Sequence, residues 1–250
     1  MSEFPAKHLV LVRHGESEGD VRRGLTAQPT SHALLKHPLH EEQTSRGHEQ
    51  SVLSGQWIAK FVLQPYAIEG FDWQYTSPLI RTKQSAESLG LLGKWSEDPR
   101  LSERDRGKIQ GMTKLQHQDE YPQSYTAMLE APLAWAPPEG ESLLKVLKRF
   151  SSHVHDFVES EATMGICMTH RDVMWMAHAP LDGMSRGSLA NFDSSALDNA
   201  HIMHYTNVEP SSGRATTRQL VWKRSCTPWL GGSGQPVRTI DWTQLSLNNL

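Results

Sequence analysis

Cysteine is scarce in this chain, since only Cys167 and Cys226 occur among its 250 residues. Two cysteines cannot form a disulfide framework, so we expect a reduced, cytoplasmic location. Long apolar runs are missing as well, and none approaches the roughly 18 residues that a membrane span needs. The segment before residue 9 lacks the apolar core of a signal peptide. We therefore expect no membrane partner.

An excess of charge of one sign is also absent, because 25 Lys and Arg stand against 28 Asp and Glu, a formal net charge of −3. This balance gives no bulk attraction to nucleic acid. Hydrophobic residues at 37% and charged residues at 21% are typical of a soluble globular protein. We predict a single domain over 1–250, with a motif-bearing core at 7–178, a late helix and strands at 179–225 and a tail at 226–250.

Compact apolar segments alternate with helical patterns along the chain. Leu9–Val12 and Met164–Thr169 are short and almost wholly apolar, which is typical of strands buried on both faces of a sheet. Amphipathic helical patterns lie between and after them. This alternation predicts the α/β class, as a three-layer α/β/α sandwich with a central, mostly parallel sheet.

Periodicity, capping residues and proline predict the other elements. The further strands or extended segments are expected at Phe71–Thr76, Trp95–Leu101, His201–Val208 and Thr217–Lys223, the last two being candidates for a pair. The helices are expected at Ser45–Leu63, from Ser77 to Leu89, at Met112–Glu130 with a break at Pro122, from Ser142 onward, and at Met174–Ala179 up to Pro180.

Three local features complete this prediction. The buried stripe of the first helix is expected to consist of Val52, Ile58, Ala59 and Val62. Ser77 is expected to cap the next helix, with Pro78 at its first position. The polar segment from Glu16 to about Gln43 is predicted to be an irregular loop, and loops of this length are often functional lids.

Arg13 and His14 stand directly after the first predicted strand. In open α/β sheets, ligands bind beyond the carboxyl ends of the strands. An arginine there can hold phosphate oxygens with its forked donors while a histidine attacks the phosphorus. The tripeptide Arg-His-Gly alone fits a surface loop equally well, so the prediction depends on the segments downstream.

Three later segments repeat this placement of a polar side chain at the end of an element. Arg81 falls in the first turn of a predicted helix, His170 follows Met164–Thr169, and Glu103 follows an extended segment. A carboxylate such as Glu103 can protonate a leaving oxygen and later activate water. Two arginines, two histidines and one acid are the residue types that phosphoryl transfer through a histidine needs.

At this point the chain resembles the histidine phosphatase superfamily, in its phosphoglycerate mutase-like branch, over roughly residues 7–178. The motifs appear in family order as Arg13-His14-Gly15-Glu16-Ser17, Ser77-Pro78 with Arg81 and Gln84-Ser85-Ala86, Leu101-Ser102-Glu103 with Gly107 and Gly111, Gly140-Glu141-Ser142, and Thr169-His170.

The resemblance implies a role for each matching residue. His14 would be the nucleophile that forms a phosphohistidine, and Glu103 would be the general acid and then the base. Arg13, Arg81 and His170 would bind the phosphoryl oxygens. It implies a phosphatase acting on a small phosphorylated substrate, with no cofactor and no required metal, since the arginines supply the positive charge.

Two positions depart from the family pattern. Asp20 stands where the family usually has Asn, and an acid there would repel phosphate unless it is protonated, turned away or paired with Arg22 or Arg23. Arg171 replaces the glycine that often follows the second histidine, and it either adds a cation to the pocket or faces solvent. Ser17, Asp20 and Arg171 are all candidate substrate contacts.

Rival groups surround the predicted site. Asp105 and Glu97 are close enough in sequence to compete with Glu103 for the role of acid. The remaining histidines show no clean set of metal ligands, so no metal site is predicted. They include His32, His37, His40 and His48 in or beside the polar loop, His153 and His155 at a spacing that separates them on a helix, and His201 and His204 on a strand.

Two other functions remain open at this stage. A cofactor-dependent phosphoglycerate mutase would share the chemistry, but its first motif is typically followed by Trp-Asn and a Gly-Trp segment, whereas this chain has Gly19-Asp20. The second is a protein that binds a phosphorylated ligand in this pocket without turning it over, and Asp20 is the feature that points to it. The natural substrate, which could be a sugar phosphate, a phosphoglycolate-like acid, a nucleotide or a phosphoprotein, is not specified.

Overall fold

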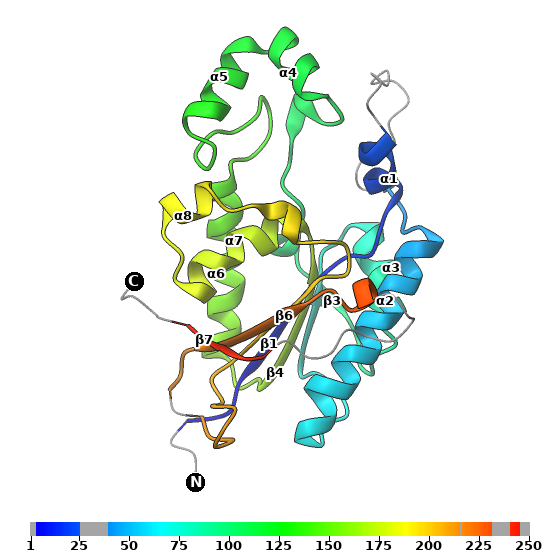
Figure 1. Cartoon of the computed structure of the whole chain (residues 1–250), viewed down its shortest axis with the longest axis vertical. Helices are drawn as coiled ribbons and strands as arrows, with labels where there is room; N and C mark the ends of the chain where they lie inside the picture. The colour runs from blue at the N-terminus through cyan, green and yellow to red at the C-terminus, as the bar shows by residue number, and fades with distance from the viewer. Residues whose placement is uncertain (1–3, 26–39, 216, 232–240, 246–250) are drawn as a thin grey trace.

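A seven-stranded sheet in the order β3-β2-β4-β1-β5-β6-β7 forms the centre of the computed structural model, which describes residues 4–25, 40–215, 217–231 and 241–245 (Figure 1). The strands are β1 His8–Arg13, β2 Trp73–Thr76, β3 Ser96–Glu97, β4 Met164–Thr169, β5 Ile202–Thr206, β6 Trp222–Cys226 and β7 Thr243–Gln244. Strand β1 is paired on both sides and all six of its residues are buried, which explains its continuous apolar sequence.

The sheet is mixed. Strands β3, β2, β4 and β1 pair in parallel, and β5, β6 and β7 are added to β1 by antiparallel pairing. The predicted pairing of the two late strands is therefore confirmed, although β6 begins at Trp222 rather than Thr217. The predicted α/β class is also confirmed.

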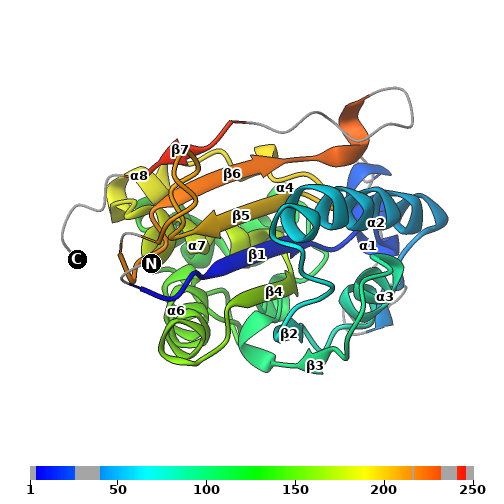
Figure 2. The same cartoon turned by 90° about the horizontal axis from the view of Figure 1, so that it is seen from below.

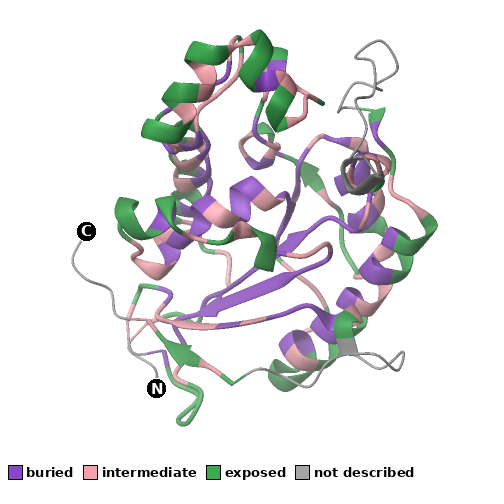
Figure 3. Ribbon diagram, turned by 45° about the horizontal axis from the view of Figure 1, so that its top comes forward, coloured by how far each residue is buried: buried purple, intermediate pink, exposed green. Residues whose placement is uncertain are grey.

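Helices cover both faces of the sheet (Figure 2). Their bounds are α1 Glu18–Leu25, α2 Ser45–Ile58, α3 Ile80–Ser88, α4 Lys114–Glu120, α5 Pro122–Glu130, α6 Leu143–Glu159, α7 Arg171–Asp182 and α8 Arg186–Ala190. Leu9 and Leu11 of β1 pack into one core cluster with α6 and α7. Val10 and Val12 pack into the other with α2 and α3, so the two hydrophobic layers meet at β1, inside the sheet that Figure 3 shows as largely buried.

Helix α2 continues as a π-helical turn, Ala59–Leu63, so the predicted span is correct but its buried stripe is partly wrong. Ile58 and Val62 are buried, whereas Ala59 is exposed and Val52 is half-buried. Small residues share the buried face with Trp57 and Ile58, and at Gly55 the end of α3 lies very close. A Cβ atom on Gly55 would lie 1.9 Å from the Leu89 carbonyl oxygen.

The predicted loop from Glu16 is wrong over its first part, where α1 forms. The backbone N–H of Ser17 donates to Asp20 Oδ2 at 3.0 Å, and the Asp20 N–H reaches back to Ser17 Oγ at 3.4 Å. This is a reciprocal cap of the Ser-x-x-Asp type, a signal that the sequence already carried. The remainder of the predicted loop up to residue 39, with His32 and His37, lies outside the described residues.

Two predictions about helix ends are also wrong. Helix α3 begins at Ile80 with Leu79 as its N-cap, and the Ser77 hydroxyl contacts His170 Nε2 at 2.8 Å and accepts from the Leu79 N–H at 3.4 Å. Helix α7 begins directly after His170 and runs through Pro180 to Asp182. Proline removes one hydrogen bond there, near the end of a helix whose inner face is buried in the core. The break at Pro122 is confirmed, since it separates α4 from α5.

No helix in the described part of the chain has the length and apolar content to cross a bilayer.

Candidate active site

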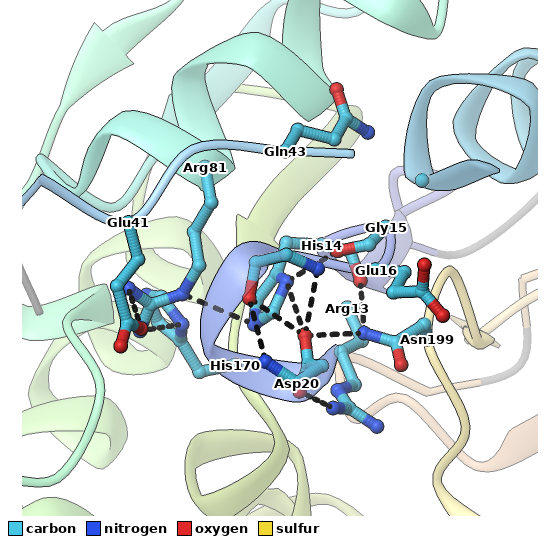
Figure 4. A network of polar contacts seen from close by, with 12 residues as sticks. Arg13, His14, Gly15, Glu16, Asp20, Glu41, Gln43, Arg81, His170 and Asn199 are labelled. Atoms are coloured by element: carbon cyan, nitrogen blue, oxygen red, sulfur yellow. Dashed lines mark hydrogen bonds and ion pairs between the residues drawn. The ribbon is translucent and has the colours of Figure 1, made fainter. Parts of the chain in front are cut away.

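The carboxyl ends of β1 and β4 bring the two motif histidines together. Arg13 pairs in register with Thr169, so His14 and His170 follow at the same edge of the sheet. Their ring centroids lie 5.1 Å apart. Arg81, from the first turn of α3, reaches the same point (Figure 4). Parallel pairing is thus what joins residues that are far apart in the sequence.

His14 is almost wholly buried and has a defined orientation. Its Nδ1 lies 2.7 Å from the Gly15 carbonyl oxygen, which can only accept, so the proton is on Nδ1. The lone pair of Nε2 then faces Arg81 Nε at 3.3 Å. Burial lowers the pKa of His14 well below its usual value, Arg81 and Arg13 add to this, and Asp20 opposes it. The ring is therefore neutral at pH 7, the form that a nucleophile requires.

Arg81 connects the two histidines. Its Nη2 lies 3.4 Å from His170 Nδ1, while Nε faces His14. His170 Nε2 lies 2.8 Å from Ser77 Oγ, and burial lowers the pKa of His170 well below its usual value. Arg81 Nη1 also lies 3.6 Å from Oε2 of Glu41. Glu41 is a buried carboxylate that no sequence motif predicted as part of the site.

Asp20 is paired with Arg13, whereas the side chain of Arg23, one of its two predicted partners, lies outside the described residues. Asp20 Oδ1 accepts from Arg13 Nη2 at 3.0 Å, while the other Arg13 Nη donates to the Leu197 carbonyl at 2.7 Å. Arg22 instead contacts Glu41. Asp20 Oδ2 accepts from Ser17 Oγ at 2.8 Å and from Asn199 Nδ2 at 3.1 Å. Asp20 therefore joins the first motif to the segment that precedes β5.

Glu103 is half-buried, and its environment differs from that of its rivals. Burial raises its pKa, the Asp172 carboxylate raises it further, and the charges of Arg106 and Arg81 oppose the rise. Asp172 is buried and accepts from Arg106 Nη2 at 2.9 Å.

The rival carboxylates lie at the surface. Asp105 is exposed and accepts from the Gly107 N–H at 2.8 Å, and Glu97 is exposed on β3 and paired with Lys83 at 3.2 Å. Of these three acids, Glu103 is the one that is not exposed. Arg171 is half-buried as the first residue of α7.

The histidines outside the motifs are scattered. His153 is buried and His155 exposed on α6, as their spacing predicts. His204 Nε2 contacts His8 Nδ1 at 3.1 Å, next to Arg224. In the described residues, no group of three or more His, Cys, Asp or Glu side chains is arranged to hold a metal ion.

A model of the histidine phosphatase superfamily, branch 1, matches residues 9–220. The chain belongs to this superfamily. It is 30% identical over 177 residues to a glucosyl-3-phosphoglycerate phosphatase of Mycolicibacterium vanbaalenii, a match that covers 70% of each chain. It is 26% identical over 190 residues to a 2,3-bisphosphoglycerate-dependent phosphoglycerate mutase of Bartonella bacilliformis, covering 71% of this chain and 82% of the mutase. Superfamily relatives thus include phosphatases and mutases.

Solved structures show the same fold. The mycobacterial glucosyl-3-phosphoglycerate phosphatase in complex with VO3 has a TM-score of 0.62 at 21% identity, covering 84% of this chain and 100% of that chain. The phosphoserine phosphatase of Entamoeba histolytica in complex with 3-phosphoglyceric acid has a TM-score of 0.59 at 19% identity, covering 80% and 90%. The superfamily membership expected from the motifs is confirmed.

Proposed function

We propose that this chain is a metal-independent phosphatase that hydrolyses a small phosphomonoester through a phosphohistidine on His14. The observation that carries the proposal is the orientation of His14, whose Nδ1–H donates to Gly15 O while Nε2 faces Arg81. A buried neutral imidazole whose unprotonated nitrogen faces a guanidinium is suited to attack a phosphorus atom that this guanidinium binds in its place.

In the first step, His14 Nε2 forms a bond to phosphorus as the ester P–O bond breaks. Arg13, Arg81 and His170 act on the phosphoryl oxygens, where negative charge is spread in the transition state. Glu103 donates its proton to the leaving oxygen. The raised pKa of Glu103 supports this role, because it keeps the acid protonated closer to neutral pH.

In the second step, water attacks the phosphohistidine. Glu103, now ionised, accepts a proton from the water as the new P–O bond forms and the N–P bond breaks. Phosphate leaves, and His14 and Glu103 return to their starting protonation states. Ser17, Asp20 and Arg171 were predicted as further substrate contacts, and in this proposal Ser17 and Asp20 act by holding Arg13 in place.

The mutase relatives favour a second candidate, a phosphoglycerate mutase that returns the phosphoryl group to its substrate. Conversion of 3- to 2-phosphoglycerate that depends on 2,3-bisphosphoglycerate would identify it. Phosphate binding without turnover of any ester would instead identify a binding protein. Both cysteines are free and buried, which supports a cytoplasmic location as part of the same proposal.

The test is hydrolysis of p-nitrophenyl phosphate between pH 5 and 8 in the presence of EDTA. The wild type should turn over, and His14→Ala should not. His155→Ala is the matched control, because it removes an exposed histidine of α6. Turnover retained by His14→Ala with the fold intact would overturn the proposal, and turnover abolished by EDTA would overturn its metal independence.

A further inference from the structure

Both arginines of the site face a carboxylate of the same chain. Arg13 Nη2 lies 3.0 Å from Asp20 Oδ1, and Arg81 Nη1 lies 3.6 Å from Glu41 Oε2. Arg13, Arg81 and Glu41 are buried, with relative exposures of 7%, 3% and 4%. The two carboxylates therefore offset part of the positive charge that the arginines present to a phosphoryl group. Because these groups are buried, solvent screens their interactions poorly.

Glu41 is held in this place by its surroundings. Its other carboxylate oxygen, Oε1, contacts Arg22 from α1. The carboxylate also rests against Gly19, where a Cβ atom would lie 2.2 Å from Glu41 Oε2. A glycine at position 19 thus makes the room that the buried carboxylate occupies.

The charge of Glu41 is close to the predicted nucleophile. His14 Nε2 and Glu41 Oε2 contact two nitrogens of the same guanidinium, that of Arg81, from different sides (Figure 4). An anion bound by Arg81 therefore shares that guanidinium with the Glu41 carboxylate and is repelled by it.

We propose that Glu41, with Asp20, makes the site select phosphomonoesters that have an uncharged leaving group over esters that carry a carboxylate or a second phosphate. The inference rests on the proposed function and names its substrate class. Each added negative charge on the ligand increases its repulsion by these carboxylates, and built-in repulsion is a common source of specificity.

The first test measures the binding of inorganic phosphate by calorimetry at pH 7.5, a readout independent of turnover. Glu41→Gln should bind phosphate about tenfold more tightly than the wild type. Gly19→Ala, whose methyl group displaces the Glu41 carboxylate, should also bind more tightly. Glu42→Gln is the matched control, because it removes an exposed carboxylate from the adjacent position and should leave the affinity unchanged.

The second test compares kcat/KM for glycerol 3-phosphate and 3-phosphoglycerate, which differ in a hydroxymethyl group against a carboxylate. The wild type should prefer glycerol 3-phosphate, and Glu41→Gln should reduce the ratio severalfold while Glu42→Gln does not. Phosphate binding by the wild type with no gain in Glu41→Gln, or a wild-type preference for 3-phosphoglycerate, would overturn the inference alone. Failure of the wild type and Glu41→Gln alike to bind phosphate would overturn the proposed function as well.

Discussion

Replacing Asp20 by Asn should destabilise the protein. Asp20 Oδ2 faces three donors, at Ser17 N, Ser17 Oγ and Asn199 Nδ2, and Oδ1 faces Arg13 Nη2. An amide keeps most of these contacts only with its oxygen in the place of Oδ2. Its NH2 group then points at the Arg13 guanidinium, so two donors meet and the ion pair is lost.

The size of this effect follows from the burial of the pair. The side chains of Arg13 and Asp20 are 8% and 12% exposed, so their hydrogen bond is charge-assisted and largely shielded from water. Such a bond contributes about 1.5–3 kcal/mol. We expect Asp20→Asn to lower the free energy of unfolding by about 2 kcal/mol, which corresponds to a fall of about 4–8 °C in Tm for a chain of this length.

Urea denaturation followed by tryptophan fluorescence measures this, since the chain has eight tryptophans. Asp193→Asn is the control, because Asp193 is an exposed carboxylate whose hydrogen bonds are local, to Ser195, including one from the Ser195 N–H at 2.9 Å. Its denaturation midpoint should not change. The charge of Asp20 raises the pKa of His14, so its loss lowers that pKa further and leaves His14 neutral at pH 7. A midpoint for Asp20→Asn equal to that of the wild type would refute the reasoning.

Three further predictions concern the arginine, the acid and the buried histidines. Arg81→Lys should lower kcat/KM for p-nitrophenyl phosphate about 100-fold, because an ammonium cannot replace a guanidinium that makes three contacts, and a loss below tenfold would contradict this. Glu103→Gln should lower kcat by about 100-fold on alkyl phosphates and less on p-nitrophenyl phosphate, whose leaving group needs no proton, while Glu97→Gln should change neither. The free energy of unfolding should fall between pH 6.5 and 4, by about 1.4 kcal/mol per pH unit for each buried histidine, because the unfolded chain binds protons that the native state excludes. His8 and His201, whose pKa values burial lowers to about 4, contribute over this whole range, and urea denaturation that is independent of pH there would contradict their burial.

The central strands and the motif residues could be predicted because their signals are local. Burial on both faces of β1 and β4 requires the continuous apolar runs seen at Leu9–Val12 and Met164–Thr169. The strand ends then placed His14 and His170 at one edge, and parallel pairing brought them together. These features depend on few other parts of the chain.

The contacts within the site could not be predicted because they join distant segments. Asn199 reaches Asp20 from 179 residues away, and Glu41 meets Arg81 through the packing of a segment that carried no periodic signal. Packing also outweighed local rules at Pro180, which lies inside α7 because the inner face of that helix is buried. The Ser17-x-x-Asp20 cap, in contrast, was visible in the sequence and predicts the start of α1.

Identification of the residue that is phosphorylated during turnover distinguishes a phosphohistidine on His14 from any other route. The wild type is mixed with p-nitrophenyl phosphate, quenched in alkali, which preserves phosphohistidine, and mapped by mass spectrometry alongside His14→Ala. We expect one phosphoryl group on His14 in the wild type and none in the variant. Phosphoryl transfer to another residue, or turnover by the wild type with no phosphoenzyme and undiminished turnover by His14→Ala, would contradict it.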